Sequence, residues 1–230
     1  MGPLATADLF YKIVANTDAH SDAGHIRILI DNNPKIPDRT AALLEGSDAP
    51  LSFIVDAAQT LARMGADLLL LPCNTSHAYY PQLCEAVSTP VINMIEETAA
   101  QAAKMRLKHV GLLATKGTLF ARLYDDALAQ YGIEAVRPSE SGQAEVMALI
   151  YDGIKAGEDT FDTTRVCGEL NRMRDQGAET FILGCTELPV AFERYRIAYP
   201  SIDPSLILAK AAIVRAGYRV KADNPAPYEV

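Results

Sequence analysis

Two segments of the sequence repeat one pattern, and this repeat limits the folds that the chain can adopt. Residues 65–75 read GADLLLLPCNT and residues 177–187 read GAETFILGCTE, so that residue 65 matches residue 177 at an offset of 112. Each segment has a Gly-Ala turn, a short apolar run and then a cysteine, Cys73 or Cys185. Such runs are typical of parallel strands that are covered on both faces. The repeat therefore predicts two related halves, each with a cysteine at the carboxyl end of a buried strand, where ligands bind in open α/β sheets.

Short apolar runs alternate with longer amphipathic segments along the chain. We predict strands at 26–30, 67–71, 91–93, 109–114, 133–136, 180–183 and near 202. We predict helices at 4–16, 51–64, 77–87, 95–106, 118–131, 141–155, 160–176, 187–196 and 205–217. This alternation is typical of βαβ units. The predicted fold is α/β, with two pseudo-symmetric three-layer α/β/α domains, mainly parallel sheets, and an active site in the cleft between them.

No linker rich in Ser, Gly or Pro separates the halves. We place the first domain at 1–100 plus 203–230, so that the C-terminal helix returns to the first half, and the second domain at 101–202. The second half opens with the apolar run 109–114, whereas the first half opens directly with a helix. We therefore expect the first sheet to lack its opening strand and the chain to start about one strand late. A parallel sheet without that strand exposes an edge or a groove.

Charge and cysteine content exclude several other classes of protein. The net charge is −8, so no overall positive field attracts nucleic acid or an acidic membrane. The four cysteines form no CxxC pair, and no histidine lies at metal-ligand spacing, which argues against a zinc site or a dithiol redox motif. No apolar run reaches the ~18 residues of a membrane span, and the N-terminus does not resemble a signal peptide. We therefore predict a cytoplasmic protein with reduced thiols, and no metal, nucleic-acid or membrane partner.

The two matched cysteines suit a proton transfer in which one thiol acts on each face of a carbon atom. A thiolate removes a proton from one face and the opposite thiol returns a proton to the other, so the product is the mirror image. The thiol pKa of ~8.5 falls near helix N-termini and cations, and each cysteine precedes a predicted helix. The alternative is that they are small buried packing residues. We favour catalysis for Cys73 and Cys185, and packing for Cys84 and Cys167.

Polar residues follow both cysteines and the first strand of the second half. Hydroxyl and amide groups beside backbone N–H groups at a helix N-terminus bind anions such as a carboxylate. They also cap helices, and the two roles are compatible. The residues with this pattern are Asn74, Thr75, Ser76, Thr115, Thr118 and Thr186.

Two motifs resemble those of a known family. The segments PCNTSH at 72–77 and GCTELP at 184–189 resemble the cofactor-independent aspartate/glutamate racemase superfamily over nearly the whole chain. Glu187, together with the segments 1–6 and 32–40, resembles the aspartate racemase branch. The resemblance implies catalysis by the two cysteines without a cofactor, and it also implies a homodimer.

The same resemblance implies that Met1, Arg39 and Lys155 contact the substrate, with Arg39 and Lys155 binding its carboxylates. From the sequence alone, Arg39 is a loop arginine and Lys155 is a lysine favoured by the negative end of a helix dipole. An arginine binds a carboxylate through a bidentate fork, whereas a lysine is a compact point charge.

The predicted function is the interconversion of L- and D-aspartate, extending to glutamate or a broader set of amino acids. One alternative is a related isomerase of the maleate isomerase or hydantoin racemase type. An arylmalonate decarboxylase is disfavoured, because those enzymes keep only one of the two cysteines. A catalytically silent ligand-binding homologue is the third. Two neighbours of the cysteines stay open: His77 either orients a reacting group or is structural, and Glu187 either caps its loop or contacts substrate.

Overall fold

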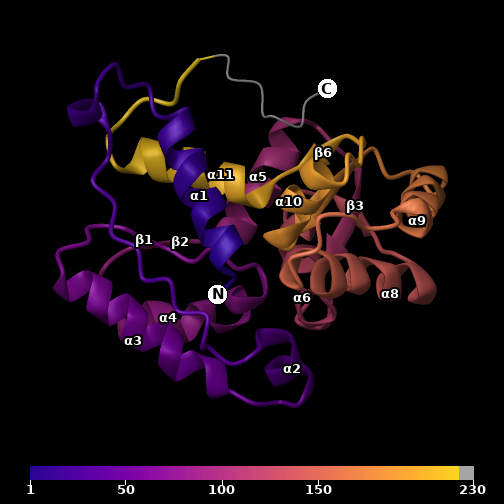
Figure 1. Cartoon of the computed structure of the whole chain (residues 1–230), viewed down its shortest axis with the longest axis horizontal. Helices are drawn as coiled ribbons and strands as arrows, with labels where there is room; N and C mark the ends of the chain where they lie inside the picture. The colour runs from indigo at the N-terminus through magenta and orange to yellow at the C-terminus, as the bar shows by residue number, and fades with distance from the viewer. Residues whose placement is uncertain (223–230) are drawn as a thin grey trace.

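The structure, a computed structural model, describes residues 1–222 and contains two parallel sheets (Figure 1). The first sheet pairs β1 (Leu69–Leu70) with β2 (Val91–Ile92). The second sheet has the order β4-β3-β5-β6. Its strands are β3 (His109–Ala114), β4 (Glu134–Val136), β5 (Thr180–Gly184) and β6 (Ser201–Ile202). The predicted α/β class with parallel sheets is confirmed.

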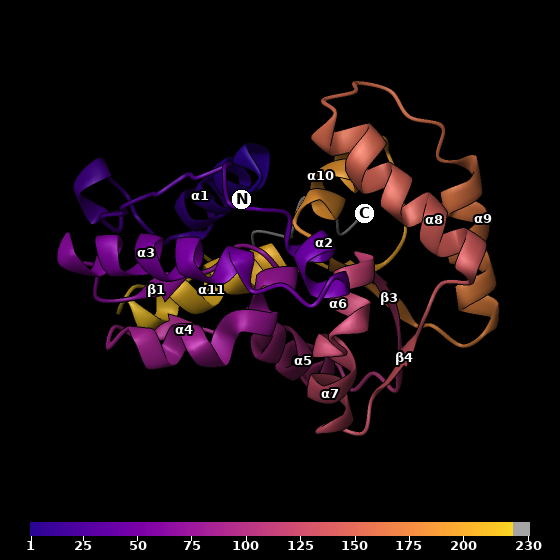
Figure 2. The same cartoon turned by 90° about the horizontal axis from the view of Figure 1, so that it is seen from below.

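Helices surround both sheets. In both views α1, α3, α4 and α11 lie around the first sheet, and α8, α9 and α10 lie around the second (Figure 2). The α-helices are α1 (Pro3–Asn16), α2 (Arg39–Leu44), α3 (Ala49–Arg63), α4 (Tyr80–Ala86), α5 (Met94–Lys104), α6 (Lys116–Phe120), α7 (Leu123–Ala129), α8 (Glu140–Ala148), α9 (Thr164–Asp175), α10 (Glu187–Arg194) and α11 (Pro204–Arg215). Short 3₁₀-helices form at η1 (Asp22–Gly24) and η2 (Thr75–Tyr79), and a π-helix forms at η3 (Leu149–Lys155).

The sequence repeat is also a structural repeat. Leu69 and Leu70 match Phe181 and Ile182 at the offset of 112, and both pairs lie in strands. Leu69 pairs with Val91 and Leu70 with Ile92. Phe181 and Ile182 pair in the same way with the two residues of β6. β5 continues further than β1, to Gly184. Because the pairing register is nevertheless the same, Cys73 and Cys185 lie at matched positions beyond the carboxyl ends of these strands.

The predicted strand at 26–30 is wrong. These residues form no strand. Their counterpart in the second half is β4, which pairs only with β3. No strand precedes α1 in the described chain, so the first sheet has no counterpart of β3. Without that neighbour, residues 26–30 have no backbone hydrogen-bond partner within residues 1–222, although Ile26 and Ile28 still pack against the apolar core.

Three predicted helices also differ from the structure. The predicted helix 77–87 is divided between the 3₁₀-helix η2 and the helix α4. The predicted helix 118–131 is broken into α6 and α7, because Arg122 has a left-handed backbone with φ of 52°. The predicted helix 141–155 widens after α8 into the π-helix η3. Short π-helical segments of this kind often lie at functional sites. The helix α2 was not predicted, because its six residues show too little periodicity; the carboxylate of Asp38 begins it by accepting from the Ala41 N–H.

The helix α11 packs beside α1 and α5 (Figure 1). A buried ion cluster fastens this contact: Lys12 Nζ lies 2.5 Å from Asp8 Oδ2 and 2.6 Å from Asp203 Oδ2. One apolar cluster contains residues of these three helices and also of β3 and α7. The domain boundaries at 100/101 and 202/203 stay a prediction, and residues 223–230 of the predicted first domain lie outside the described residues. None of the described helices is long and apolar enough to cross a membrane.

Candidate active site

A cleft with about 360 Å³ of atom-free space lies at the carboxyl ends of β1, β3 and β5. Nine of the eleven residues predicted for the site line it. They are Met1, Arg39, Cys73, Asn74, Thr75, Thr115, Lys155, Cys185 and Thr186. The other two, Ser76 and Thr118, are fully buried and do not line the cleft. Residues from both halves of the repeat thus meet at one place.

Hydrogen bonds of its backbone fix the position of the half-buried Cys73. Its N–H donates to the Leu71 carbonyl at 2.8 Å, and its carbonyl accepts from His77 Nδ1 at 2.9 Å. The other ring nitrogen of His77, Nε2, accepts from the Met94 N–H at 3.1 Å, which fixes the proton on Nδ1. Burial lowers the pKa of His77 to about 4, because the charged ring is disfavoured away from water. His77 is therefore a neutral structural histidine that positions the Cys73 loop.

The other cysteine has a different environment. Cys185 is buried, with 7% of its surface exposed. Its thiol donates to Glu187 Oε2 at 3.0 Å, and the Thr186 hydroxyl donates to the same oxygen at 3.3 Å. Burial raises the pKa of Cys185 well above its usual value, and the Glu187 carboxylate adds to this, whereas Lys155 opposes it. At neutral pH the group is therefore a thiol.

A tyrosine from the second half fixes the amide next to Cys73. The Tyr124 hydroxyl donates to Asn74 Oδ1 at 2.6 Å, and both side chains are buried. This bond leaves the amide nitrogen of Asn74 without a partner among residues 1–222. A buried donor without a partner is unfavourable, so Asn74 is a prepared donor beside Cys73. Burial raises the pKa of Tyr124, which keeps its hydroxyl protonated.

Three threonine hydroxyls join the two halves. Thr75 lies 3.0 Å from Thr115 and 2.9 Å from Thr118, and Thr115 and Thr118 are 3.2 Å apart. Only Thr75 and Thr115 of the three face the cleft. Gly117 allows this close approach, because a Cβ there would lie 3.0 Å from Cγ2 of Thr75 and 2.8 Å from the Thr40 backbone.

Two cations line the cleft without an ion-pair partner in the described chain. The guanidinium of Arg39 is tethered by Nη1, which donates to the Ile36 and Pro37 carbonyls at 3.1 and 3.0 Å, and its Nε has no partner within residues 1–222. Lys155, the last residue of η3, is exposed, and its Nζ lies 3.8 Å from the ring centroid of Tyr151. No described carboxylate lies within ion-pair distance of either one, so both are available to an anionic ligand.

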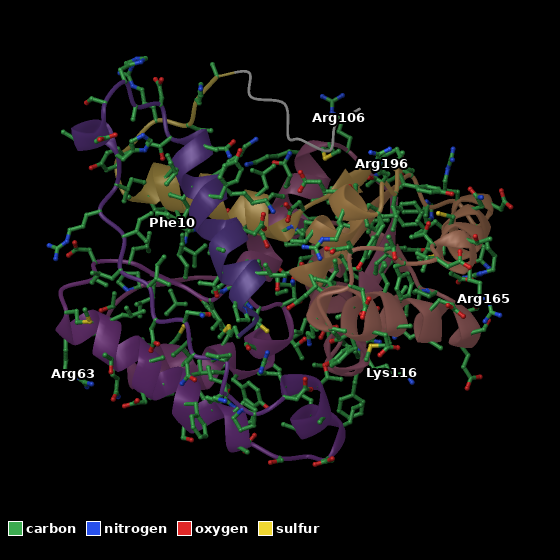
Figure 3. All side chains as sticks on the ribbon, in the orientation of Figure 1. Phe10, Arg63, Arg106, Lys116, Arg165 and Arg196 are labelled. Carbon is green, nitrogen blue, oxygen red and sulfur yellow. The ribbon has the colours of Figure 1, made fainter. Side chains whose placement is uncertain are left out.

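Other cations lie away from the cleft. Figure 3 labels Arg63, Arg106, Arg165 and Arg196, which are all exposed and do not line the cleft. The cleft thus brings Arg39 and Lys155 together in a protein whose net charge is −8. The Met1 ammonium also reaches the cleft, where it donates to the Asn33 carbonyl at 2.5 Å. Burial and the charge of Arg39 lower the pKa of this ammonium.

Six further residues line the cleft that the sequence did not assign to it: Gly2, Asp38, Thr40, Pro72, Tyr151 and Glu187. The Tyr151 hydroxyl donates to Asp38 Oδ2 at 3.0 Å, which connects η3 to the start of α2. Asp38 precedes Arg39, and Tyr151 lies one turn before Lys155. Their closeness in the chain to these two cations could have predicted that they also line the cleft. Cys84, predicted to be a packing residue, is exposed, whereas Cys167 is half-buried. No cluster of metal-binding side chains occurs among the described residues.

Two parallel sheets that each place a cysteine in one shared cleft make this an α/β protein with a site built from two repeated halves. The chain belongs to the Asp/Glu/Hydantoin racemase family, whose model matches residues 1–212. It is therefore an isomerase of the racemase type, as the sequence motifs predicted.

Individual relatives agree with this family. The chain is 29% identical over 221 residues to the broad specificity amino-acid racemase RacX of Bacillus subtilis, which covers 93% of each protein. It is 31% identical to the aspartate racemase of Picrophilus torridus, with a TM-score of 0.80 over 96% of this chain and 92% of that one. An aspartate racemase homologue from Pyrococcus horikoshii has a TM-score of 0.73 at 24% identity over 94% of this chain and 95% of that one. This last likeness concerns the fold alone.

Proposed function

We propose that the protein is a cofactor-independent racemase that interconverts L- and D-aspartate with Cys73 and Cys185 as its two acid–base groups. The observation that carries this proposal is the shared cleft, which both cysteines line from matched strand ends. The thiolate of Cys73 takes the proton from Cα and becomes a thiol. Cys185 then gives its own proton to the opposite face of Cα and becomes a thiolate. The reverse sequence converts the other enantiomer, so atoms and charge balance in both directions.

The α-carboxylate binds where neutral donors gather. Its partners are Asn74, Thr75, Thr115 and Thr186. When Cα loses its proton, negative charge spreads onto the α-carboxylate, and donors that are already in place stabilise this charge without rearranging. The unpartnered amide nitrogen of Asn74 supports this role. Ser76 and Thr118 are assigned a supporting role behind these donors, because both are buried away from the cleft.

The side-chain carboxylate of aspartate binds Arg39 and Lys155, with Met1 beside them. Both cations lack a carboxylate partner in the described part of the chain, which supports an acidic substrate. The aspartate racemase of Picrophilus torridus, at 31% identity, supports aspartate. RacX, named for broad specificity and 29% identical, supports a wider set of amino acids as the second candidate. A racemization assay over acidic, polar and apolar amino acids separates the two.

The mechanism requires both thiols in the reduced form. This requirement fits the cytoplasmic location that the sequence predicts, where disulfides are rare. A homodimer stays a prediction from the family resemblance.

Deuterium incorporation tests the proposal. L-aspartate incubated with the protein in deuterated water should yield D-aspartate that carries deuterium at Cα, detected by chiral chromatography and mass spectrometry. Cys73→Ala and Cys185→Ala should each abolish inversion, whereas Cys84→Ala, which removes an exposed thiol, should not. Inversion that persists in both single variants would refute the two-thiol mechanism. Deuterium-free D-aspartate would refute proton transfer at Cα.

A further inference from the structure

The two cysteines are not equivalent in their polar contacts. The thiol of Cys185 donates to Glu187 Oε2 at 3.0 Å. Cys73 has Arg39 as a neighbouring charge, and no carboxylate of residues 1–222 is hydrogen-bonded to its sulfur. From this geometry we propose that Glu187 holds Cys185 as the proton-bearing member of the pair in the resting enzyme, which leaves Cys73 as the base. The inference rests on the proposed function and assigns the roles within it.

The hydrogen bond itself requires the thiol form. A carboxylate has no proton to donate, so the hydrogen between Cys185 Sγ and Glu187 Oε2 belongs to the sulfur. If Cys185 lost this proton, a thiolate and a carboxylate would face each other in a site where both are buried. Two like charges in a poorly solvated site disfavour ionisation of the second group. Burial and Glu187 both raise the pKa of Cys185, in agreement with this contact.

Several other charged or titratable groups face the pair. Lys155 on η3 lowers the pKa of Cys185. The Met1 ammonium and the Arg39 guanidinium interact with Glu187 from the start of α1 and from α2. Tyr124 on α7 faces Cys185 and stays protonated. These cations offset part of the charge of Glu187, but none of them replaces the hydrogen bond that it accepts from the thiol.

Glu187 also acts on the second half of the cycle. To protonate Cα, Cys185 must break its bond to Glu187 and turn its hydrogen toward the substrate. The resulting Cys185 thiolate lies beside the Glu187 carboxylate, so repulsion favours its reprotonation after product leaves. Glu187 is therefore a positioning residue that acts through Cys185.

The test measures protonation of Cys185 directly. A chain in which Cys73, Cys84 and Cys167 are serine has Cys185 as its only cysteine, and NMR of a ¹³C label at its Cβ reports the thiolate as pH rises. The midpoint should lie well above the ~8.5 of a free cysteine. Glu187→Gln keeps an acceptor but removes the charge, and it should lower the midpoint by at least about one pH unit, a tenfold gain in thiolate. Glu187→Asp should stay nearer to the parent than to the Gln variant.

Glu193→Gln is the matched control, because it removes one negative charge from an exposed position on the same helix. It should leave the midpoint unchanged. An unchanged midpoint in Glu187→Gln, or an equal shift in Glu193→Gln, overturns the inference. Circular dichroism shows whether the Gln variant folds; if it does not, a parent midpoint at or below ~8.5 overturns the inference equally.

This titration requires no turnover, so its failure is separable from that of the proposed function. A chain whose Cys185 responds to Glu187 but which exchanges no deuterium into aspartate refutes the racemase alone. A racemase whose Cys185 ignores Glu187 refutes the inference alone.

Discussion

The two halves place a cysteine at the same point of the same structural unit but surround it differently. Cys73 is half-buried, and its loop is held by the neutral ring of His77. Cys185 is buried and donates to a carboxylate. The sheets differ as well: within residues 1–222 the first has two short strands and the second has four strands. Repetition of the backbone thus fixes where each thiol lies, whereas side chains outside the strands decide which form of the thiol is favoured.

The largest expected effect is on substrate binding, where the cations of the two halves should contribute unequally. Arg39, in the first half, is half-buried and tethered to two carbonyls, whereas Lys155, in the second half, is exposed over a tyrosine ring. A hydrogen-bonded partner of a charged group contributes ~3 kcal/mol when well ordered, and an exposed ion pair contributes ~1 kcal/mol. Arg39→Gln should therefore raise the KM for aspartate about 100-fold, and Lys155→Gln about fivefold.

Steady-state kinetics on aspartate measures both values. Arg63→Gln removes an exposed arginine elsewhere and should leave KM unchanged. A larger effect from Lys155→Gln than from Arg39→Gln would show that the order of the two cations is wrong. A KM that neither variant changes would remove both from the binding site.

The second expected effect is a dependence of stability on pH that only the Cys73 loop contributes. His77 supports Cys73, but the matched position in the second half is Pro189, which cannot titrate. The pKa of His77 is about 4 in the folded protein against 6.5 for a free histidine, so the unfolded state binds more protons between these values. The contribution of the neutral His77 ring to the free energy of unfolding is fully present above pH 6.5 and is lost as the pH falls toward 4. We expect a loss of about 2 kcal/mol in the free energy of unfolding between pH 8 and 5 from this residue.

Urea unfolding at both pH values measures this loss. His77→Asn should be less stable than the parent at pH 8. Between pH 8 and 5 it should lack the part of the stability loss that comes from protonation of His77. His20→Asn removes a ring whose side chain is 94% exposed and should retain it. If His77→Asn loses as much stability as the parent between pH 8 and 5, the buried ring is not the source.

The sequence predicted the elements that depend on local pattern. Cys73 and Cys185 were found because a short strand and the loop after it occur twice in the chain, at an offset of 112. The prediction of a strand at 26–30 was wrong because a strand requires a neighbouring strand, and an apolar pattern cannot show whether that neighbour exists. Ser76 follows the cleft residue Thr75 directly and Thr118 lies three residues after the cleft residue Thr115, but both are fully buried away from the cleft. Tyr124 gave no signal, because it reaches Asn74 across 50 residues of chain, and only the assembled halves bring them together.

The smallest effect tests this contact between the halves. Tyr124→Phe removes the hydroxyl that donates to Asn74 Oδ1 at 2.6 Å. The Asn74 amide then loses the bond that fixes which end faces the cleft, and its oxygen can turn toward the substrate carboxylate. Because that carboxylate gains charge as Cα is deprotonated, the loss of about 1.4 kcal/mol should lower kcat about tenfold and change KM less.

Tyr195→Phe is the matched control, since it removes a hydroxyl that donates to the Glu158 carbonyl away from the cleft. It should leave kcat unchanged. Thermal unfolding of both variants separates a loss of orientation from a loss of stability. A Tyr124→Phe protein with unchanged kcat would mean that Asn74 keeps its orientation without the tyrosine. The contact between Tyr124 and Asn74 would then serve stability rather than catalysis, and the threonine hydroxyls would be the contact between the halves that remains beside Cys73.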